Sequence, residues 1–302
     1  MPPRPGGGRR ILTRMRRELR VERGGSADAR WEMTDGAPGA GLAGMVRTYR
    51  GYAERSPAPV ARREFPEAHV LLVVGFGDPL LVSDAAGGHR LTSFVAGPGG
   101  GVRRTEHSGV QDGVEVLLSP WGAYQLLGVP VGELAGRVVD LAGVLGRVGV
   151  DLTERLAGAR AGIRACDWEG RFALLDEVFA GLAARGPSPD PDLVHAYDRL
   201  AGRHGDLAIG ELLADTGWSR RRLADRFRAQ TGLTPKAAAR VLRLSRARGL
   251  LTGSGDRSLA SVAAACGYYD QAHLHRDFRA LAGCTPTEYR AAQLSGLPGT
   301  GA

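Results

Sequence analysis

Two segments of the sequence share a pattern of apolar residues, glycine and arginine that suits the binding of a polyanion. Residues 207–235 and 257–286 resemble each other, with Gly217 and Gly267 fifty positions apart and later matching positions fifty-one apart. One residue is therefore added in the turn after the second glycine. Each segment predicts a short helix, a tight turn at a glycine that tolerates the left-handed conformation, and a second helix.

The second helix of the first segment carries arginines outside its apolar face. Ser219 is expected to cap this helix, and Leu223 and Phe227 lie four apart on its buried side. Arginine near the start of such a helix suits the major groove of DNA, because its guanidinium forms bidentate hydrogen bonds with guanine and neutralises phosphates. The candidate DNA contacts here are Ser219, Arg220, Arg221 and Arg228.

The second helix of the second segment repeats this arrangement. Asp270 is expected to cap it, and Leu274 and Phe278 form its buried side. Polar and basic residues occupy the remaining faces, so this helix is also predicted to contact DNA. The candidates are Asp270, Gln271, His275, Arg276 and Arg279.

A long helix is predicted to join the two segments. Thr234 and Pro235 form a helix start, and about seventeen residues follow up to Leu251, which gives a length near 25 Å. Such a helix would hold the two DNA-contacting helices roughly one DNA turn apart. Lys236 is a candidate phosphate contact. Phosphate contact and a solvated or structural role both stay open for Arg240, Arg243, Arg246 and Arg248.

Residues from about 195 to 292 resemble the DNA-binding domain of AraC/XylS-type transcriptional regulators. The likeness is strongest in the second segment, where the sequence between Ser258 and Arg290 reads SLASVA, then GY, DQAHL, R, FR, G and TPTEYR at the family's internal spacing. The resemblance implies an all-α domain whose two helix–turn–helix units contact adjacent major grooves. It places Arg221, Ala224 and Asp225 toward DNA in the first unit, and Gln271, Ala272, His275 and Arg276 in the second.

One position departs from the family pattern. The family often has arginine where this sequence has Asp225. A carboxylate there can accept a hydrogen bond from cytosine but repels phosphate. This departure makes the base contacts of the first helix less certain, and Arg220 or Arg221 could compensate. Arg221 and Arg276 are the residues expected to carry specificity.

The first half of the chain predicts a different type of structure. Short apolar stretches at 70–74, 80–82, 92–96 and 114–118 alternate with glycine-rich turns and indicate strands, and apolar residues at helical spacing follow from Leu134 to Leu145 and beyond. Residues 60–186 loosely resemble the sensor half of an actinobacterial-type subgroup of the same family, mainly through the PWGA, LGVP and EL stretches between Pro120 and Leu134.

The predicted fold class is therefore α+β: a β-rich N-terminal sensor domain with a helical continuation, and an all-α C-terminal domain of two helix–turn–helix units joined by a linker helix. The expected domains are a disordered basic tail over residues 1–32, a sensor or dimerisation domain over 33–186, the DNA-binding domain over 190–292, and a disordered tail over 293–302. A length of 302 residues fits two domains.

The net charge of +8 is unevenly distributed. Residues 1–23 carry +6, residues 24–189 carry −3 and residues 190–302 carry +5. The basic C-terminal part fits a polyanionic partner. Three scattered cysteines exclude a disulfide scaffold, and the absence of a long apolar stretch argues against a membrane protein and against a signal peptide, so we expect a cytoplasmic, nucleoid-associated protein.

Candidate residues for a ligand of the first half are few. Arg103 and Arg104 follow a glycine-rich stretch and could contact an anionic effector, and the aromatic residues Trp121 and Tyr124 could line an effector pocket. A flexible loop and an aromatic core are the favoured explanations of these residues. The sequence predicts no catalytic residues, metal site or cofactor.

The leading hypothesis is a transcriptional regulator, an activator by family resemblance. It would bind double-stranded operator or promoter DNA, RNA polymerase and a small-molecule effector, and could form a homodimer. Two alternatives stay open: an enzyme fused to a DNA-binding domain, and an N-terminal domain that serves only as an oligomerisation module.

Overall fold

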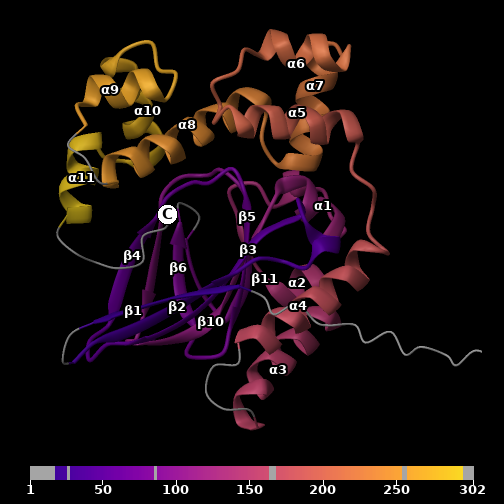
Figure 1. The fold of residues 1–302 in the computed structure, drawn as a ribbon, viewed down its shortest axis with the longest axis vertical. Coiled ribbons are helices and arrows are strands. Elements are labelled where there is room, and N and C mark those ends of the chain that lie inside the picture. Colours follow the sequence, from indigo (N-terminus) through magenta and orange to yellow (C-terminus); the bar gives the residue numbers. More distant parts are fainter. Residues whose placement is uncertain (1–17, 26–27, 85–86, 163–167, 254–256, 295–302) are drawn as a thin grey trace, which may run out of the picture.

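A computed structural model describes residues 18–25, 28–84, 87–162, 168–253 and 257–294. Strands dominate residues 19–140, and helices form the rest of the described chain (Figure 1). The predicted α+β fold class is confirmed, with a β-rich N-terminal part followed by an all-helical part that holds the helix–turn–helix units.

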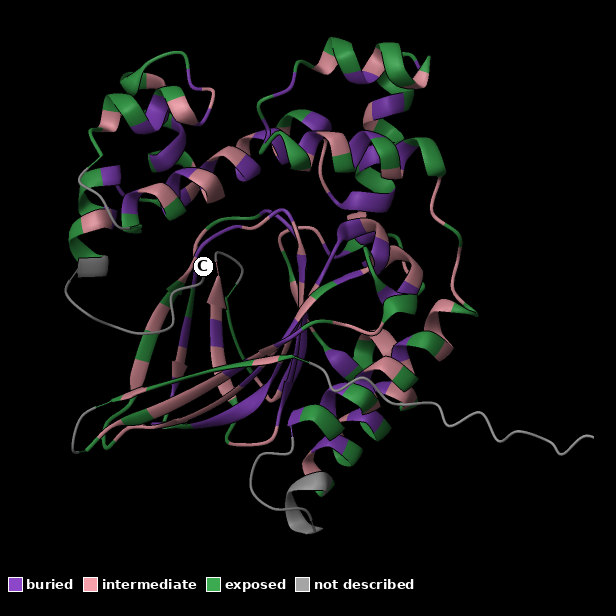
Figure 2. Cartoon of the chain, in the orientation of Figure 1, coloured by how far each residue is buried: buried purple, intermediate pink, exposed green. Residues whose placement is uncertain are grey.

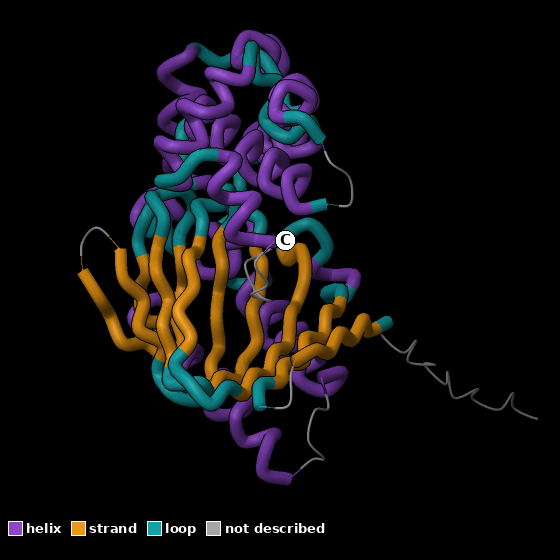
Figure 3. The backbone as a smooth tube through the Cα atoms, turned by 90° about the vertical axis from the view of Figure 1, so that its left-hand side faces the viewer, coloured by secondary structure: helices purple, strands orange, loops and turns teal. Residues whose placement is uncertain are grey.

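The strands form two sheets that face each other (Figure 3). A seven-stranded sheet has the order β1-β2-β3-β10-β5-β8-β11, and a four-stranded sheet has the order β4-β9-β6-β7, with antiparallel pairing throughout. The strands are β1 (Leu19–Gly25), β2 (Arg30–Gly36), β3 (Val46–Arg55), β4 (Val60–Glu64), β5 (Val70–Gly75), β6 (Leu80–Asp84), β7 (Gly87–Leu91), β8 (Ser93–Ala96), β9 (Arg103–His107), β10 (Val110–Leu118) and β11 (Val138–Asp140).

The outer face of the larger sheet packs against helix α4 (Trp168–Ala183). Side chains alternate between the two faces of a strand, so Val114 and Val116 of β10 point into this core while Glu115 lies on the other face. The ring of Tyr49 on β3 stacks on Phe172, with centroids 5.3 Å apart. Gly51, also on β3, makes room for Trp168, because a Cβ there would lie only 2.3 Å from the indole.

Further helices complete the N-terminal part. Ser119 caps α1 by accepting the amide hydrogen of Gly122 at 3.0 Å. The apolar spacing near Val138 predicted one helix, but residues 138–140 form the edge strand β11, which pairs with β8 before a short helix begins. The elements are η1 (Ala40–Leu42), α1 (Pro120–Leu127), η2 (Val131–Glu133), α2 (Leu141–Leu145) and α3 (Arg147–Gly162).

The expected tail over residues 1–32 is wrong for its last part. Strand β1 pairs with β2 over seven residues, and the indole of Trp31 covers Gly24. Backbone pairing with β2, together with the contact of Leu19 with the main core, orders a segment whose composition alone suggested disorder. Residues 1–17 lie outside the described residues, and the expected tail at 293–302 is wrong for 293 and 294, which belong to helix α11.

The C-terminal part consists of helices on either side of the long helix α8, which spans the space above the strands (Figure 1). Buried positions run along α8, toward both groups of helices (Figure 2). The helices are α5 (Pro191–Gly202), α6 (Ile209–Thr216), α7 (Arg220–Thr231), α8 (Pro235–Thr252), α9 (Leu259–Ala265), α10 (Gln271–Ala282) and α11 (Pro286–Leu294).

Candidate nucleic-acid interface

The first helix–turn–helix unit consists of α6 and α7. Gly217 ends α6 in the left-handed conformation, with φ of 64°, and Ser219 caps α7 by accepting the amide hydrogen of Arg222 at 3.3 Å. Leu223 and Phe227 are buried in the core of the unit. The predicted turn, cap and buried face are all present.

The opposite side of α7 is exposed and basic. Arg220, Arg221, Asp225 and Arg228 are all exposed, as is the cap Ser219. The side chain of Arg221 is 93% exposed and lies 3.8 Å from the Asp225 carboxylate one helical turn away. Such a pair between exposed groups is weak in water, so Arg221 can be redirected to a stronger partner at little cost.

The second unit, α9 and α10, has the same construction. The Asp270 carboxylate accepts the amide hydrogen of His273 at 2.6 Å, and Leu274 and Phe278 are fully buried. Gln271, Ala272, Arg276 and Arg279 are exposed, whereas His275 is half-buried and its Nε2 has no hydrogen-bond partner within the described part of the chain.

Most of the arginines on α8 have intramolecular partners. Arg240 forms an ion pair with the buried Asp277 of α10 at 2.9 Å, and Arg243 donates to the Gly205 carbonyl at 2.9 Å. Arg248 donates to Glu67 at 2.6 Å. Lys236, near the start of α8, is exposed. Of the cations on this helix, Lys236 is therefore the one best placed for a phosphate.

Asp277 is a structural residue that sequence reasoning missed. Its Oδ1 accepts a hydrogen bond from Nε of Arg240 at 3.0 Å and lies 2.9 Å from Nη2, which fixes α10 against α8. The sequence pattern could have identified Asp277, because an acidic residue on the buried side of an amphipathic helix needs a cationic partner.

The helix–turn–helix units also contact the β-rich part. The loop between β4 and β5 inserts Phe65 beneath α11, where its ring meets Tyr289 edge-on at 5.2 Å, and the Ala68 carbonyl accepts from the Tyr197 hydroxyl at 2.8 Å. The end of α7 packs on η2, so that a Cβ at Gly132 would lie 2.9 Å from the Arg228 carbonyl oxygen. On α10, the Ala282 carbonyl accepts from Arg63 of β4 at 2.9 Å, so both units are in contact with the N-terminal part.

The four effector candidates lie in separate places. Arg103 is buried on β9 and reaches the Gly97 carbonyl at 3.4 Å, while its neighbour Arg104 is exposed beside Glu106. Trp121 donates to Asp198 of α5 at 3.3 Å, and Tyr124 packs against the main core. The structure does not bring these side chains together.

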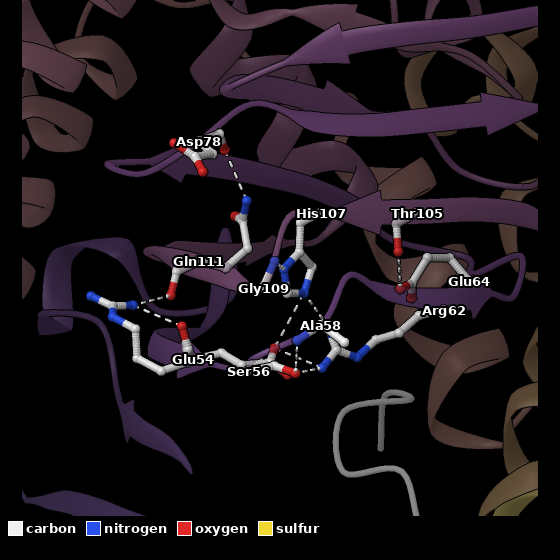
Figure 4. Close-up of polar contacts among 11 residues, drawn as sticks. Glu54, Ser56, Ala58, Arg62, Glu64, Asp78, Thr105, His107, Gly109 and Gln111 are labelled. Atoms are coloured by element: carbon white, nitrogen blue, oxygen red, sulfur yellow. Dashed lines mark hydrogen bonds and ion pairs between the residues drawn. The ribbon is translucent and has the colours of Figure 1, made fainter. Parts of the chain in front are cut away.

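A set of polar side chains lies instead between the two sheets (Figure 4). Arg62 on β4 donates to both carboxylate oxygens of Glu54 on β3 at 2.6 Å, and the nearby Glu64 accepts from Thr105 at 3.1 Å. Glu115, opposite Arg50 in the strand register, lies on this inner face. Burial raises the pKa of Glu115 to about 7, and Arg50 offsets this effect only in part. Sequence reasoning did not select these residues, because the two sheets come together only in the fold.

Comparison with known proteins locates the strongest similarity in the C-terminal part. Residues 212–292 match a family described as a helix-turn-helix domain. The chain is 36% identical over 106 residues to the MmsAB operon regulatory protein of Pseudomonas aeruginosa, covering 35% of this chain and 34% of that protein. It is 35% identical over 102 residues to the HTH-type transcriptional activator RhaS of Escherichia fergusonii, covering 33% and 36%. Both matches cover about a third of the length of these relatives.

Among solved structures, the DNA-binding domain of AdpA in complex with a target DNA is 29% identical, covers 35% of this chain and 96% of that chain, and has a TM-score of 0.33. Within the described residues, no helix combines the length and hydropathy needed to cross a bilayer, and no group of three or more His, Cys, Asp or Glu side chains could hold a metal ion. Residues 212–292 of this chain therefore form a helix-turn-helix domain.

Proposed function

We propose that the whole chain is a sequence-specific transcriptional regulator rather than an enzyme. The observation that carries this proposal is the presence of two equivalent units at the two ends of α8, each with an exposed, arginine-bearing second helix. An α8 of eighteen residues is about 27 Å long, which suits two helices entering successive major grooves on one face of DNA.

Direct base contacts are assigned to Arg221 on α7 and to Gln271, Ala272 and Arg276 on α10, which are exposed near the starts of their helices. Arg220, Arg228, Lys236 and Arg279 are assigned to phosphates. Asp225 weakens phosphate attraction on α7 and can accept a hydrogen bond from cytosine. Ser219 and Asp270 cap the N-terminal ends of α7 and α10, which are the ends proposed to face DNA.

The β-rich part is proposed to sense a small-molecule effector, as the resemblance to the sensor half of an actinobacterial-type subgroup suggests. The polar inner face between the sheets, with Arg62, Glu64 and Glu115, is a better effector candidate than the four scattered residues selected from the sequence. The contacts of Phe65 with α11, of Glu67 with α8 and of η2 with α7 provide a route from that face to the DNA-binding domain. RNA polymerase and a second copy of the chain are proposed further partners, and the cytoplasm is the proposed location.

Salt-dependent binding to duplex DNA tests this function. The full chain is titrated onto genomic fragments that it captures, at several salt concentrations, together with Arg276→Ala and, as a matched control, Arg104→Ala on the exposed face of β9. We expect Arg276→Ala to weaken binding to captured fragments by about 1–3 kcal/mol and to relax one base position, with Arg104→Ala unchanged. Equal losses in both variants, or no binding by the wild type, would contradict the proposal.

A further inference from the structure

The turns of the two helix–turn–helix units differ by one residue, and the structure identifies which one is added. Gly217 and Gly267 occupy the same left-handed position, with φ of 64° and 71°. The next residues, Trp218 and Tyr268, are both buried, at 8% and 5% exposure.

Each of these buried rings lies beneath an arginine. Arg222 lies 4.9 Å from the ring of Trp218, and Arg243 lies 5.5 Å from the ring of Tyr268. The caps Ser219 and Asp270 also correspond. One-to-one matching therefore leaves Tyr269 as the residue of the second turn that has no counterpart in the first.

Tyr269 is 94% exposed, far more than the other exposed large hydrophobic residues of the described chain. A single exposed aromatic residue needs no explanation by itself. Here its position matters, because it directly precedes the cap of α10, next to the exposed Gln271 and Ala272. The Tyr269 amide lies 3.5 Å from Nδ1 of His273, a long hydrogen bond within the same turn.

We propose that the Tyr269 hydroxyl donates a hydrogen bond to a DNA backbone phosphate beside the groove that α10 enters. This inference rests on the proposed DNA-binding function and assigns the second unit an anchoring contact that the first lacks. Tyrosine hydroxyls are regular phosphate donors in protein–DNA complexes.

The salt dependence of DNA affinity distinguishes a phosphate contact made by a neutral hydroxyl from one made by a cation. Replacing a cationic contact lowers the dependence of log affinity on log salt by roughly 0.9 per phosphate, whereas losing a neutral donor leaves that slope unchanged. Because phosphate contacts are independent of sequence, the probe is a 30-base-pair duplex of arbitrary sequence at low salt.

The experiment compares full-length Tyr269→Phe and Tyr269→Ala with two controls by fluorescence anisotropy. We expect Tyr269→Phe to weaken binding roughly three- to tenfold with an unchanged salt slope. Tyr268→Phe, the same change at a buried ring, should match the wild type, and Arg279→Ala should lower the slope. Wild-type affinity in Tyr269→Phe overturns the inference, and so does a loss confined to Tyr269→Ala, since that assigns the contact to the ring. A wild type that binds no duplex overturns the proposed function itself, whereas a change in Tyr269 variants alone leaves that function standing.

Discussion

The guanidinium of Arg248, on the helix that joins the two DNA-binding units, lies 2.6 Å from the carboxylate of Glu67 in the β-rich part. The Arg248 side chain is only 6% exposed, and it lies over the ring of Phe65 at 4.5 Å and contacts the Tyr289 hydroxyl at 3.3 Å. One buried cation thus connects α8, α11 and the loop between β4 and β5.

Removing Glu67 leaves this buried cation without its carboxylate. We expect Glu67→Ala to lower the free energy of unfolding by about 1–3 kcal/mol, less than for a fully buried pair because Glu67 remains partly exposed. Arg248→Met removes the charge and keeps apolar contact, so adding it to Glu67→Ala should cost little more. Denaturant unfolding of the two single variants and the double variant measures this coupling. Additive losses of unfolding free energy would show that the pair is not coupled. The control is Glu106→Ala, which removes one partner of an exposed ion pair and should cost under about 1 kcal/mol.

A methyl group at Gly132 tests the contact between η2 and α7. Its Cβ would lie 2.9 Å from the Arg228 carbonyl oxygen, so one of the two elements must move. We expect Gly132→Ala to increase amide hydrogen exchange in residues 228–233 while α10 stays protected. Gly41→Ala is the control, because a Cβ there meets nothing within 4 Å. Unchanged exchange near η2 would mean that this contact does not hold the first unit in place.

Two substitutions of Asp270, the cap of α10, distinguish effects on stability from effects on DNA affinity. Asp270→Ala should cost about 1 kcal/mol, whereas Asp270→Asn keeps an acceptor for the His273 amide and should cost only a few tenths. Because Asp270→Asn also removes a negative charge from the DNA-facing end, it should bind duplex DNA more tightly than the wild type. Thermal unfolding and anisotropy titrations measure the two effects. Weaker binding by the asparagine variant would instead indicate a direct role for the carboxylate.

The raised pKa of Glu115 predicts how stability depends on pH. A carboxyl whose pKa is higher in the folded state binds more protons when folded, so its cost is absent well below its unfolded pKa of 4.5, grows between that value and about 7, and is constant above it. Glu115→Gln should therefore raise the melting temperature at pH 8 more than at pH 5. Thermal unfolding at both pH values measures this difference. An equal shift of the melting temperature at pH 5 and pH 8 would show that the titration of Glu115 is not its cause.

The helix–turn–helix units could be predicted closely because their determinants are local. Glycine turns, caps and apolar spacing lie within each segment, and residues such as Gly217 and Asp270 have the predicted roles. Long-range pairing explains what could not be predicted. Residue type alone does not show whether Arg248 contacts DNA or Glu67. Nor does the composition of residues 19–25 show that they form a strand, because that strand depends on pairing with β2.

Footprinting on a captured genomic fragment tests the central claim most directly. The wild type should protect two patches on one face of the duplex, about one helical turn or ten base pairs apart. Arg221→Ala should lose one patch and Arg276→Ala the other, while Arg104→Ala keeps both. A single patch, or loss of the same patch in both arginine variants, would contradict the account.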